Sequence, residues 1–264
     1  MKFRARAGRV LFFVLAALLV LFLTLPLVAL VARALPLGID AWFSKTTVAA
    51  LQLSLTTATV SALIAFVVGT PVAYLLAREE FIGKKFVDTL IDLPMVLPPA
   101  VAGIALLMAF GRRGLLGPTL SFFGIELPFT IAAVIIAETF VAAPFYVRSA
   151  KAGFGAVDRK LEQMSALLGI SGLKTFFRIT MPLAAPSIVS GLLMTWARAL
   201  GEFGATIMFA GNFPGRTQTM PLAIYSGLES NLDSALALAV MLVIVSFGIL
   251  FAVRAVSPKG LTLG

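Results

Sequence analysis

Three ionisable side chains interrupt stretches that are otherwise apolar, and they are the strongest candidates for chemistry in this sequence. Arg198 and Glu202 have the spacing that places two side chains on one face of a helix, where they can form an ion pair. Glu138 is a carboxylate in a separate apolar stretch. An ionisable group in hydrocarbon is costly and favours a functional role, although a paired Arg and Glu can equally lock a helix interface.

Enzymatic chemistry is poorly supported by the residue types present. The sequence contains 0 His and 0 Cys, so the usual neutral-pH base and the thiolate nucleophile are missing, as are the commonest soft metal ligands. No Lys or Asp lies clearly inside an apolar stretch to replace them. We therefore predict that the chain is not an enzyme and binds neither a metal nor a cofactor of its own.

The composition assigns the chain to a membrane. Hydrophobic residues make up 60% of the 264 positions and charged residues only 12%, with a mean hydropathy of +1.03. A soluble domain has about 25% charged residues, so this chain lacks the charge to cover a water-facing surface. Its net charge of +9 comes from basic residues at the ends of apolar runs, which is typical of membrane topology rather than nucleic-acid binding.

Six apolar runs are long enough to cross about 30 Å of hydrocarbon as helices. We place them at about 10–31, 45–78, 93–111, 127–147, 183–208 and 234–253. Most Lys and Arg fall in the N-terminal tail, in the loops that follow the second and fourth runs, and after the sixth run. The positive-inside rule places these segments in the cytoplasm. The sequence therefore predicts an all-α membrane protein with six transmembrane helices and both termini cytoplasmic.

Three segments divide the chain. Residues 1–45 form an N-terminal tail, the first transmembrane helix and an outer loop, 46–256 form a core of five transmembrane helices, and 257–264 form a short cytoplasmic tail. Within the core, the cytoplasmic loop 156–182 has the pattern of two short helices. Asp158 is a candidate N-cap, Gly169 is a candidate left-handed stop, and Ser171 is a candidate cap for the second helix. Exposed apolar side chains on such a loop favour either docking in a partner's groove or contact with lipid.

The residues of this loop resemble the signature of permease subunits of ABC importers. Gly169, Ile179 and Pro182 stand at the family's spacing, whereas Gln163, Met164 and Ser165 replace its Glu-Ala-Ala and Met181 replaces its Leu. Glu162, one position earlier, is expected to face a different direction and not to substitute for the family's glutamate. The resemblance implies that the loop docks on a separate ATPase subunit through Glu162, Gln163, Met164, Ser165, Ala166, Gly169, Ile179 and Pro182.

A second resemblance concerns the substrate. Six segments are similar to molybdate permeases: 92–94, 97–99, 101–103, 198–206, 210–212 and 217–225. The Gly201–Gly204 block is shared with sulfate and thiosulfate permeases. The resemblance implies translocation of molybdate or tungstate, with a sulfate or thiosulfate permease as the alternative. An ion-gradient-driven anion transporter is a further alternative, in which Glu138 would be the titrating group.

The family resemblance also implies a type I importer fold and a set of partners in the cytoplasmic membrane. The chain is expected to form a homodimer in lipid, to bind two cytoplasmic ATPase subunits that hold ATP and Mg, and to receive the oxyanion from a periplasmic or lipid-anchored binding protein. Beside an anion path, Glu138 is expected to be protonated or paired, with Arg198 as a candidate partner. Residues assigned to the translocation path or the dimer interface are Glu138, Arg198, Gly201, Glu202, Phe203 and Gly204.

Overall fold

The computed structural model describes residues 2–256, so the predicted tail 257–264 lies outside the described residues. Every regular element in the described range is helical. The elements are α1 (Lys2–Ala34), α2 (Ile39–Trp42), α3 (Lys45–Arg78), α4 (Lys84–Val96), α5 (Pro99–Phe110), α6 (Gly117–Phe122), α7 (Ile131–Ala156), α8 (Arg159–Leu167), α9 (Gly172–Thr175), the π turn η1 (Phe176–Thr180), α10 (Met181–Leu200), α11 (Gly204–Ala210), α12 (Met220–Ser230) and α13 (Leu232–Val256).

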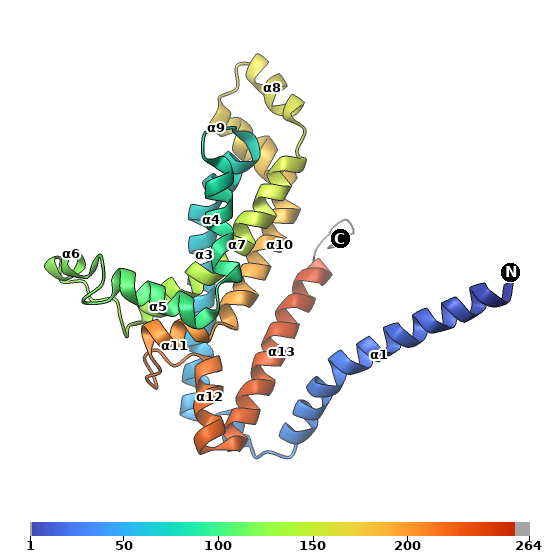
Figure 1. Cartoon of the computed structure of the whole chain (residues 1–264), viewed down its shortest axis with the longest axis vertical. Coiled ribbons are helices and arrows are strands. Elements are labelled where there is room, and N and C mark those ends of the chain that lie inside the picture. Colours follow the sequence, from blue (N-terminus) through green and yellow to red (C-terminus); the bar gives the residue numbers. More distant parts are fainter. Residues whose placement is uncertain (1, 257–264) are drawn as a thin grey trace.

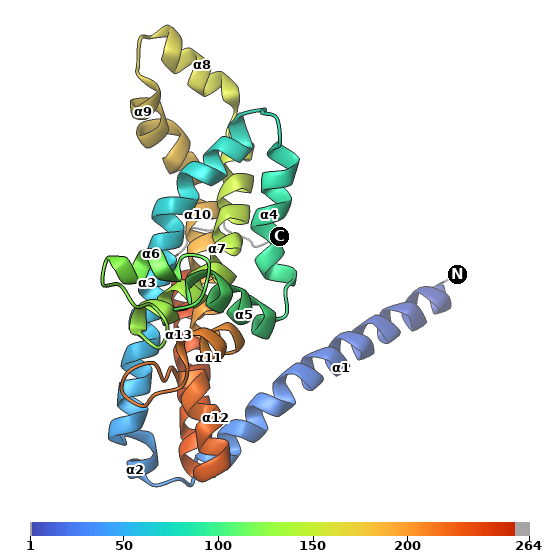
Figure 2. The ribbon, with the colours of Figure 1, turned by 60° about the vertical axis from the view of Figure 1, so that its left-hand side comes forward.

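The predicted membrane-spanning helices are present in this range. Between residues 2 and 256, five helices are long and apolar enough to cross a membrane, and a sixth crossing is formed if α4 and α5 are counted as one bent span. The prediction of an all-α membrane protein is therefore confirmed. α8 and α9 lie at one end of the bundle, and α2, α12 and the start of α13 lie at the other (Figures 1 and 2).

The centre of the bundle is formed by α3, α7 and α10, which approach one another closely at small residues. A Cβ atom at Gly191 of α10 would lie 2.8 Å from the Cβ of Ser149 on α7, and one at Gly69 of α3 would lie 2.9 Å from the ring of Tyr146. The Ser149 hydroxyl donates to the backbone oxygen of Ser187 at 2.7 Å. Small residues and interhelical hydrogen bonds are the usual means of packing helices in lipid, where the hydrophobic effect between helices is absent.

The third predicted span, a single helix over 93–111, is wrong in its boundaries. The chain instead forms α4 and α5, which meet at an angle of 117°. Leu97 and Pro98 at the junction have extended backbone angles, and two consecutive prolines lack the N–H groups that would continue a helix. The two prolines thus accompany a sharp bend between two shorter helices.

The fifth predicted span also differs from the structure. α10 ends at Leu200 rather than near residue 208, and the chain turns through Gly201–Phe203 before α11 begins. Residues 220–230, which lie between the fifth and sixth predicted spans, form the helix α12, which packs against α13. Pro221 near the start of α12 favours this helix, because its missing N–H falls in the first turn.

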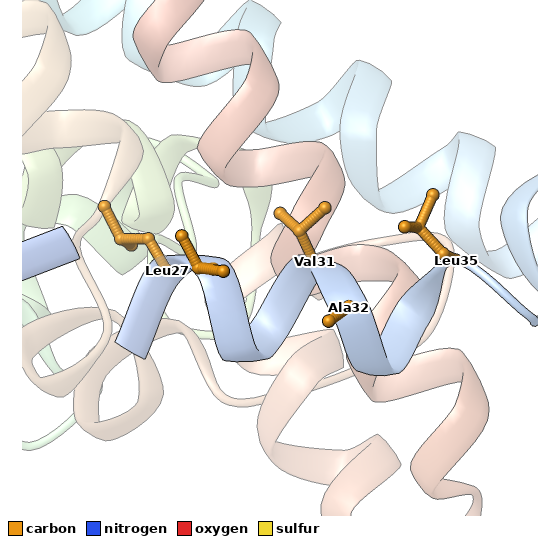
Figure 3. A pocket seen from close by; sticks show the side chains of 5 residues that line it. Leu27, Val31, Ala32 and Leu35 are labelled. Atoms are coloured by element: carbon orange, nitrogen blue, oxygen red, sulfur yellow. The ribbon is translucent and has the colours of Figure 1, made fainter. Parts of the chain in front are cut away.

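α1 diverges from the bundle and packs only partly against α13 (Figure 1). Most of its described side chains are exposed, as expected for a helix that lipid surrounds. A shallow hollow on its C-terminal part is lined by Leu27, Val28, Val31, Ala32 and Leu35 (Figure 3). This hollow offers no donor for an anion, so it is a lipid-facing surface and not a substrate site.

Candidate functional site

The loop between α7 and α10 folds as the sequence predicts at its two ends. The Asp158 side chain accepts from the backbone N–H of Lys160 at 2.9 Å and caps α8. Gly169 has a φ of +75°, the left-handed conformation that ends a helix and that glycine adopts without strain. Ser171 occupies the N-cap position of α9, but its side chain makes no capping hydrogen bond. The predicted cap at Asp158 and the predicted left-handed stop at Gly169 are therefore confirmed, whereas the Ser171 side chain does not cap α9.

Glu162 anchors this loop to the bundle. Its Oε1 atom lies 3.1 Å from Nη2 of Arg78, at the end of α3, and accepts a hydrogen bond of 2.7 Å from the hydroxyl of Thr180 in η1. Arg78 also donates to the backbone oxygen of Val157 at 3.0 Å. The side chains of Arg78 and Glu162 are 5% and 19% exposed. The carboxylate thus joins α8 to both α3 and η1.

Two further hydrogen bonds hold the loop together. The hydroxyls of Ser165 on α8 and Thr175 on α9 lie 2.7 Å apart and are buried. Arg159 donates from Nη2 to the backbone oxygen of Arg78 at 2.9 Å. These contacts fix α8 to its neighbours near both of its ends.

The outer face of the loop is apolar and open. Met164 is 60% exposed and Leu167 is 88% exposed, although both are large hydrophobic side chains. Among the predicted docking residues, Gln163 and Ala166 share this exposed side, whereas Ser165 is turned inward. The full set of exposed apolar side chains on the loop is Leu161, Met164, Leu167, Leu168, Ile170, Leu173 and Phe177.

Ile179 and Pro182 lie where α9 continues into α10. Ile179 is in the π turn, and Pro182 is in the first turn of α10. The Met181 N–H donates to the Phe176 oxygen, which is a π-helical rather than an α-helical hydrogen bond. The α-helical pattern is therefore already interrupted just before Pro182, whose nitrogen has no hydrogen to donate. The chain therefore runs as one helical segment from Gly172 to Leu200 despite the proline.

Arg198 and Glu202 form the ion pair that their spacing predicts. Arg198 Nη1 lies 2.7 Å from Glu202 Oε2, and the Glu202 side chain is 1% exposed. Glu202 Oε1 also accepts from the backbone N–H of Ala205 at 2.8 Å. The carboxylate therefore neutralises Arg198 and satisfies a free amide in the first turn of α11, which holds the break between α10 and α11 in place.

Glu138 is hydrogen-bonded to two hydroxyls, and Arg198, the partner suggested from the sequence, does not pair with it. Its two oxygens accept hydrogen bonds from Thr57 at 2.8 Å and Ser61 at 2.9 Å, and the residue is 1% exposed. Arg198 is engaged by Glu202 instead. Both hydroxyls come from one face of α3, so Glu138 joins α3 to α7. The spacing of Thr57 and Ser61 was visible in the sequence, but their position opposite α7 was not.

The small residues after α10 serve different purposes. A Cβ at Gly204 would lie 2.6 Å from the Cβ of Pro99, so this glycine allows α11 to approach α5 within the chain. The Phe203 ring packs at 5.4 Å between centroids from Tyr225 of α12. Gly201 is exposed. The predicted assignment of Gly204 to a dimer interface is therefore not favoured, whereas Gly201 lies open at the surface.

A polar network in the segment before α12 was not anticipated. Gln218 Nε2 donates to Asn212 Oδ1 at 3.0 Å, and Asn212 Nδ2 donates to the Ser226 hydroxyl at 2.8 Å. Thr217 is fully buried and accepts from the backbone N–H of Phe213 at 3.1 Å. The residues that resemble molybdate permeases in this segment thus shape the loop through internal hydrogen bonds.

A charged cluster joins α4 to α7 near the loop end of the bundle. Arg148 forms an ion pair with Asp92, and Lys151 Nζ lies 2.7 Å from Asp88 Oδ1. These four side chains are between 24% and 42% exposed. No group of three or more candidate metal ligands occurs in the part of the chain that the structure describes.

The sequence of the chain matches one protein family and is similar to several transport permeases. Residues 69–260 match the family model described as binding-protein-dependent transport system inner membrane component. The chain is 40% identical over 247 residues to the molybdenum transport system permease protein ModB of Mycobacterium tuberculosis, covering 91% of this chain and 92% of the relative. It is 37% identical over 247 residues to the molybdate/tungstate transport system permease protein WtpB of Pyrococcus abyssi, covering 92% and 93%.

A solved structure shares the fold. A chain from a bacterial ABC transporter involved in the import of the acidic polysaccharide alginate superposes with a TM-score of 0.74 over 96% of this chain and 98% of that one. The sequence identity is 19%, so this likeness concerns the arrangement of the helices alone.

Proposed function

The chain belongs to the family of binding-protein-dependent transport system inner membrane components, and from that premise we propose that it is the membrane-spanning subunit of an ATP-driven importer for molybdate or tungstate. It is a multi-pass protein of the inner membrane. It catalyses no bond chemistry itself, because in this family ATP hydrolysis belongs to a separate subunit.

The loop containing α8 carries this proposal. It combines a rigid attachment to the bundle through Glu162 with a row of exposed apolar side chains that includes Leu167 and Leu168. An exposed apolar helix on a rigid base suits docking in a groove of a partner protein. A loop that only rested on lipid would not require the Glu162 attachment to α3 and η1.

The attachment indicates how ATP binding would move the membrane helices. Two ATPase subunits that approach each other carry the α8 helices of a homodimer with them. Arg78 and Thr180 transmit that displacement to α3 and α10 through Glu162. The two conformations of the dimer then open the path to one side of the membrane or the other, and each ligand acts by stabilising one of them.

The relatives named above favour molybdate or tungstate over sulfate or thiosulfate. The ion pair between Arg198 and Glu202 lies at the end of α10, where the helix breaks. Arg198 is partly exposed, so its guanidinium remains accessible to an anion while Glu202 lies buried behind it. Arg198 is therefore the residue of this pair that we place beside the path.

The remaining partners follow from the family. A periplasmic or lipid-anchored binding protein delivers the oxyanion to the side of the dimer opposite α8, and both termini lie on the cytoplasmic side with α8. The ATPase subunits bind ATP and Mg. The 156–182 loop is the coupling loop, and Gln163, Met164 and Ala166 are docking residues within it.

Transport in reconstituted vesicles tests the proposal. Vesicles that contain this chain, its ATPase and the binding protein should accumulate molybdate when ATP is supplied on the α8 side and should not do so with ADP. Accumulation driven by an ion gradient in the absence of ATP would contradict the proposal and favour the gradient-driven alternative. Full-rate uptake by the chain without the ATPase would do the same.

A further inference from the structure

We propose that the hollow between Lys174 and Arg178 on the coupling loop is a carboxylate-binding site for an acidic side chain of the ATPase subunit. This inference rests on the proposed function, since it names a contact within the docking that the function requires. In this contact the cations lie on the permease and the acid lies on the ATPase.

The hollow has the size and lining for one side chain. Its volume is about 300 Å³, and it lies between the turn at Gly169 and the face of α9 and η1 that carries Lys174 and Arg178. The Ser171 side chain, which makes no capping hydrogen bond, also lines it. Two cations and a free hydroxyl therefore surround a space with no acidic residue in its lining.

The carboxylates of the loop are engaged elsewhere. Asp158 caps α8 through the Lys160 amide, and Glu162 is held by Arg78 and Thr180. In the described part of the chain, neither Lys174 nor Arg178 belongs to an ion pair. The positive charge of the hollow is thus available to a ligand from outside the chain.

The hollow stands too far from the membrane for lipid headgroups to fill it. The hydrogen bond between Ser149 and Ser187 sets these residues at one depth, and the adjoining Arg148 belongs to the charged cluster of α4 and α7. Four charged side chains are costly in hydrocarbon, so this depth marks the boundary of the hydrocarbon or lies beyond it.

From that depth the helix continues outward to the hollow. Arg178 lies roughly 13 Å and Lys174 roughly 20 Å beyond Ser187 along the helix, at about 1.5 Å per residue. The headgroup layer on one side of a bilayer is only about 5–8 Å thick. We therefore assign the ligand to the docked protein partner rather than to a lipid headgroup.

A carboxylate is the protein group that fits the hollow. Arg binds carboxylates through paired N–H donors, and Lys adds a point charge with three donors. The neighbouring apolar side chains, Leu168 and Leu173, would be covered by the same partner and would exclude water from the contact. Desolvation of this kind strengthens a charge pair at the centre of an interface relative to one at its rim.

Association of the reconstituted permease with its purified ATPase tests the site. The permease is placed in nanodiscs of phosphatidylcholine, and its affinity for the ATPase is measured at several salt concentrations. The double variant Lys174→Gln/Arg178→Gln should bind about tenfold more weakly or worse, with a smaller dependence on salt. The control Lys160→Gln removes an exposed cation of α8 outside the hollow and should change the affinity less than about twofold.

Carbodiimide coupling supplies a second measurement that does not depend on the variants. The reagent joins an amine to a carboxylate in direct contact, so Lys174 should form an amide with one Asp or Glu of the ATPase, identified by mass spectrometry. Wild-type affinity in the double variant, or coupling at Lys160 but not at Lys174, would overturn the inference and leave the proposed function intact.

Two other outcomes distinguish a lipid headgroup as the ligand from a failure of the proposed function. An effect of the double variant that appears only in nanodiscs with anionic lipid would assign the hollow to a headgroup and overturn the inference. If the wild-type permease did not bind the ATPase at all, the proposed function itself would fail, and the inference would fail with it.

Discussion

The anchor at Glu162 provides a quantitative test of how the coupling loop is held. Replacing Glu162 with Gln keeps an acceptor for Thr180 but removes the ion pair with Arg78. Loss of one partner from a fully buried pair costs about 3–5 kcal/mol, whereas an exposed pair contributes about 1 kcal/mol or less. Because the two side chains are 5% and 19% exposed, we expect an intermediate loss of about 2 kcal/mol in the local stability of the loop.

Hydrogen exchange measures this loss directly. A change of about 2 kcal/mol corresponds to a roughly 30-fold rise in the population of the opened loop, so the amides of α8 and α9 should exchange faster by that factor. The amides of α7 and α13 should be unaffected. Glu79→Gln is the matched control, because Glu79 is an exposed carboxylate next to Arg78 that forms no ion pair within the described residues.

The same variant should separate hydrolysis from transport. With the anchor loosened, α8 can still dock through its apolar face, but its displacement reaches α3 and α10 less completely, so less molybdate should enter per ATP hydrolysed. The reasoning is refuted if Glu162→Gln exchanges at the rate of Glu79→Gln. It is also refuted if uptake per ATP is unchanged while the loop is measurably opened.

Three further predictions concern the turn and the packing residues. Gly169→Val places a β-branched residue at positive φ, at a cost of about 1–2 kcal/mol, and should lower ATPase co-purification without lowering the amount of permease in the membrane; normal co-purification would count against docking. Arg198→Ala or Glu202→Ala should each lower the melting temperature more than the double variant does, because each leaves an unpaired charge; additive losses would indicate separate roles. Gly204→Ala should destabilise the protein by about 1–3 kcal/mol through overpacking, whereas Gly155→Ala, with no atom within 4 Å of its Cβ, should not; equal melting temperatures would refute the close approach at α11.

Features that depend on a few neighbouring residues were predictable from the sequence. The cap at Asp158, the left-handed turn at Gly169 and the ion pair between Arg198 and Glu202 each involve groups within about one turn of chain. Their geometry follows from backbone conformation and helical spacing. Hydropathy likewise located the long helices, because the need for apolar side chains in lipid acts on each segment separately.

Helix boundaries were less predictable where proline and glycine act with tertiary contacts. Hydropathy predicted one span over 93–111, and the bend of 117° at Pro98 and Pro99 could not be read from it. The break after α10 is stabilised by Glu202 capping the Ala205 amide and by the contact between Gly204 and Pro99. Apolar residues continue on both sides of this break, so a prediction from hydropathy alone extended the span through it.

The sequence by itself determined that this chain is a membrane protein made of helices and that the loop between α7 and α10 folds into two short helices. Only the tertiary structure decided the partners of the carboxylates Glu138 and Glu162. Glu138 meets Thr57 and Ser61 of α3, and Glu162 meets Arg78, in contacts between residues far apart in the chain. Such contacts depend on which faces of packed helices come together. That choice is made by the whole set of small residues and interhelical hydrogen bonds at once, and no single segment contains it.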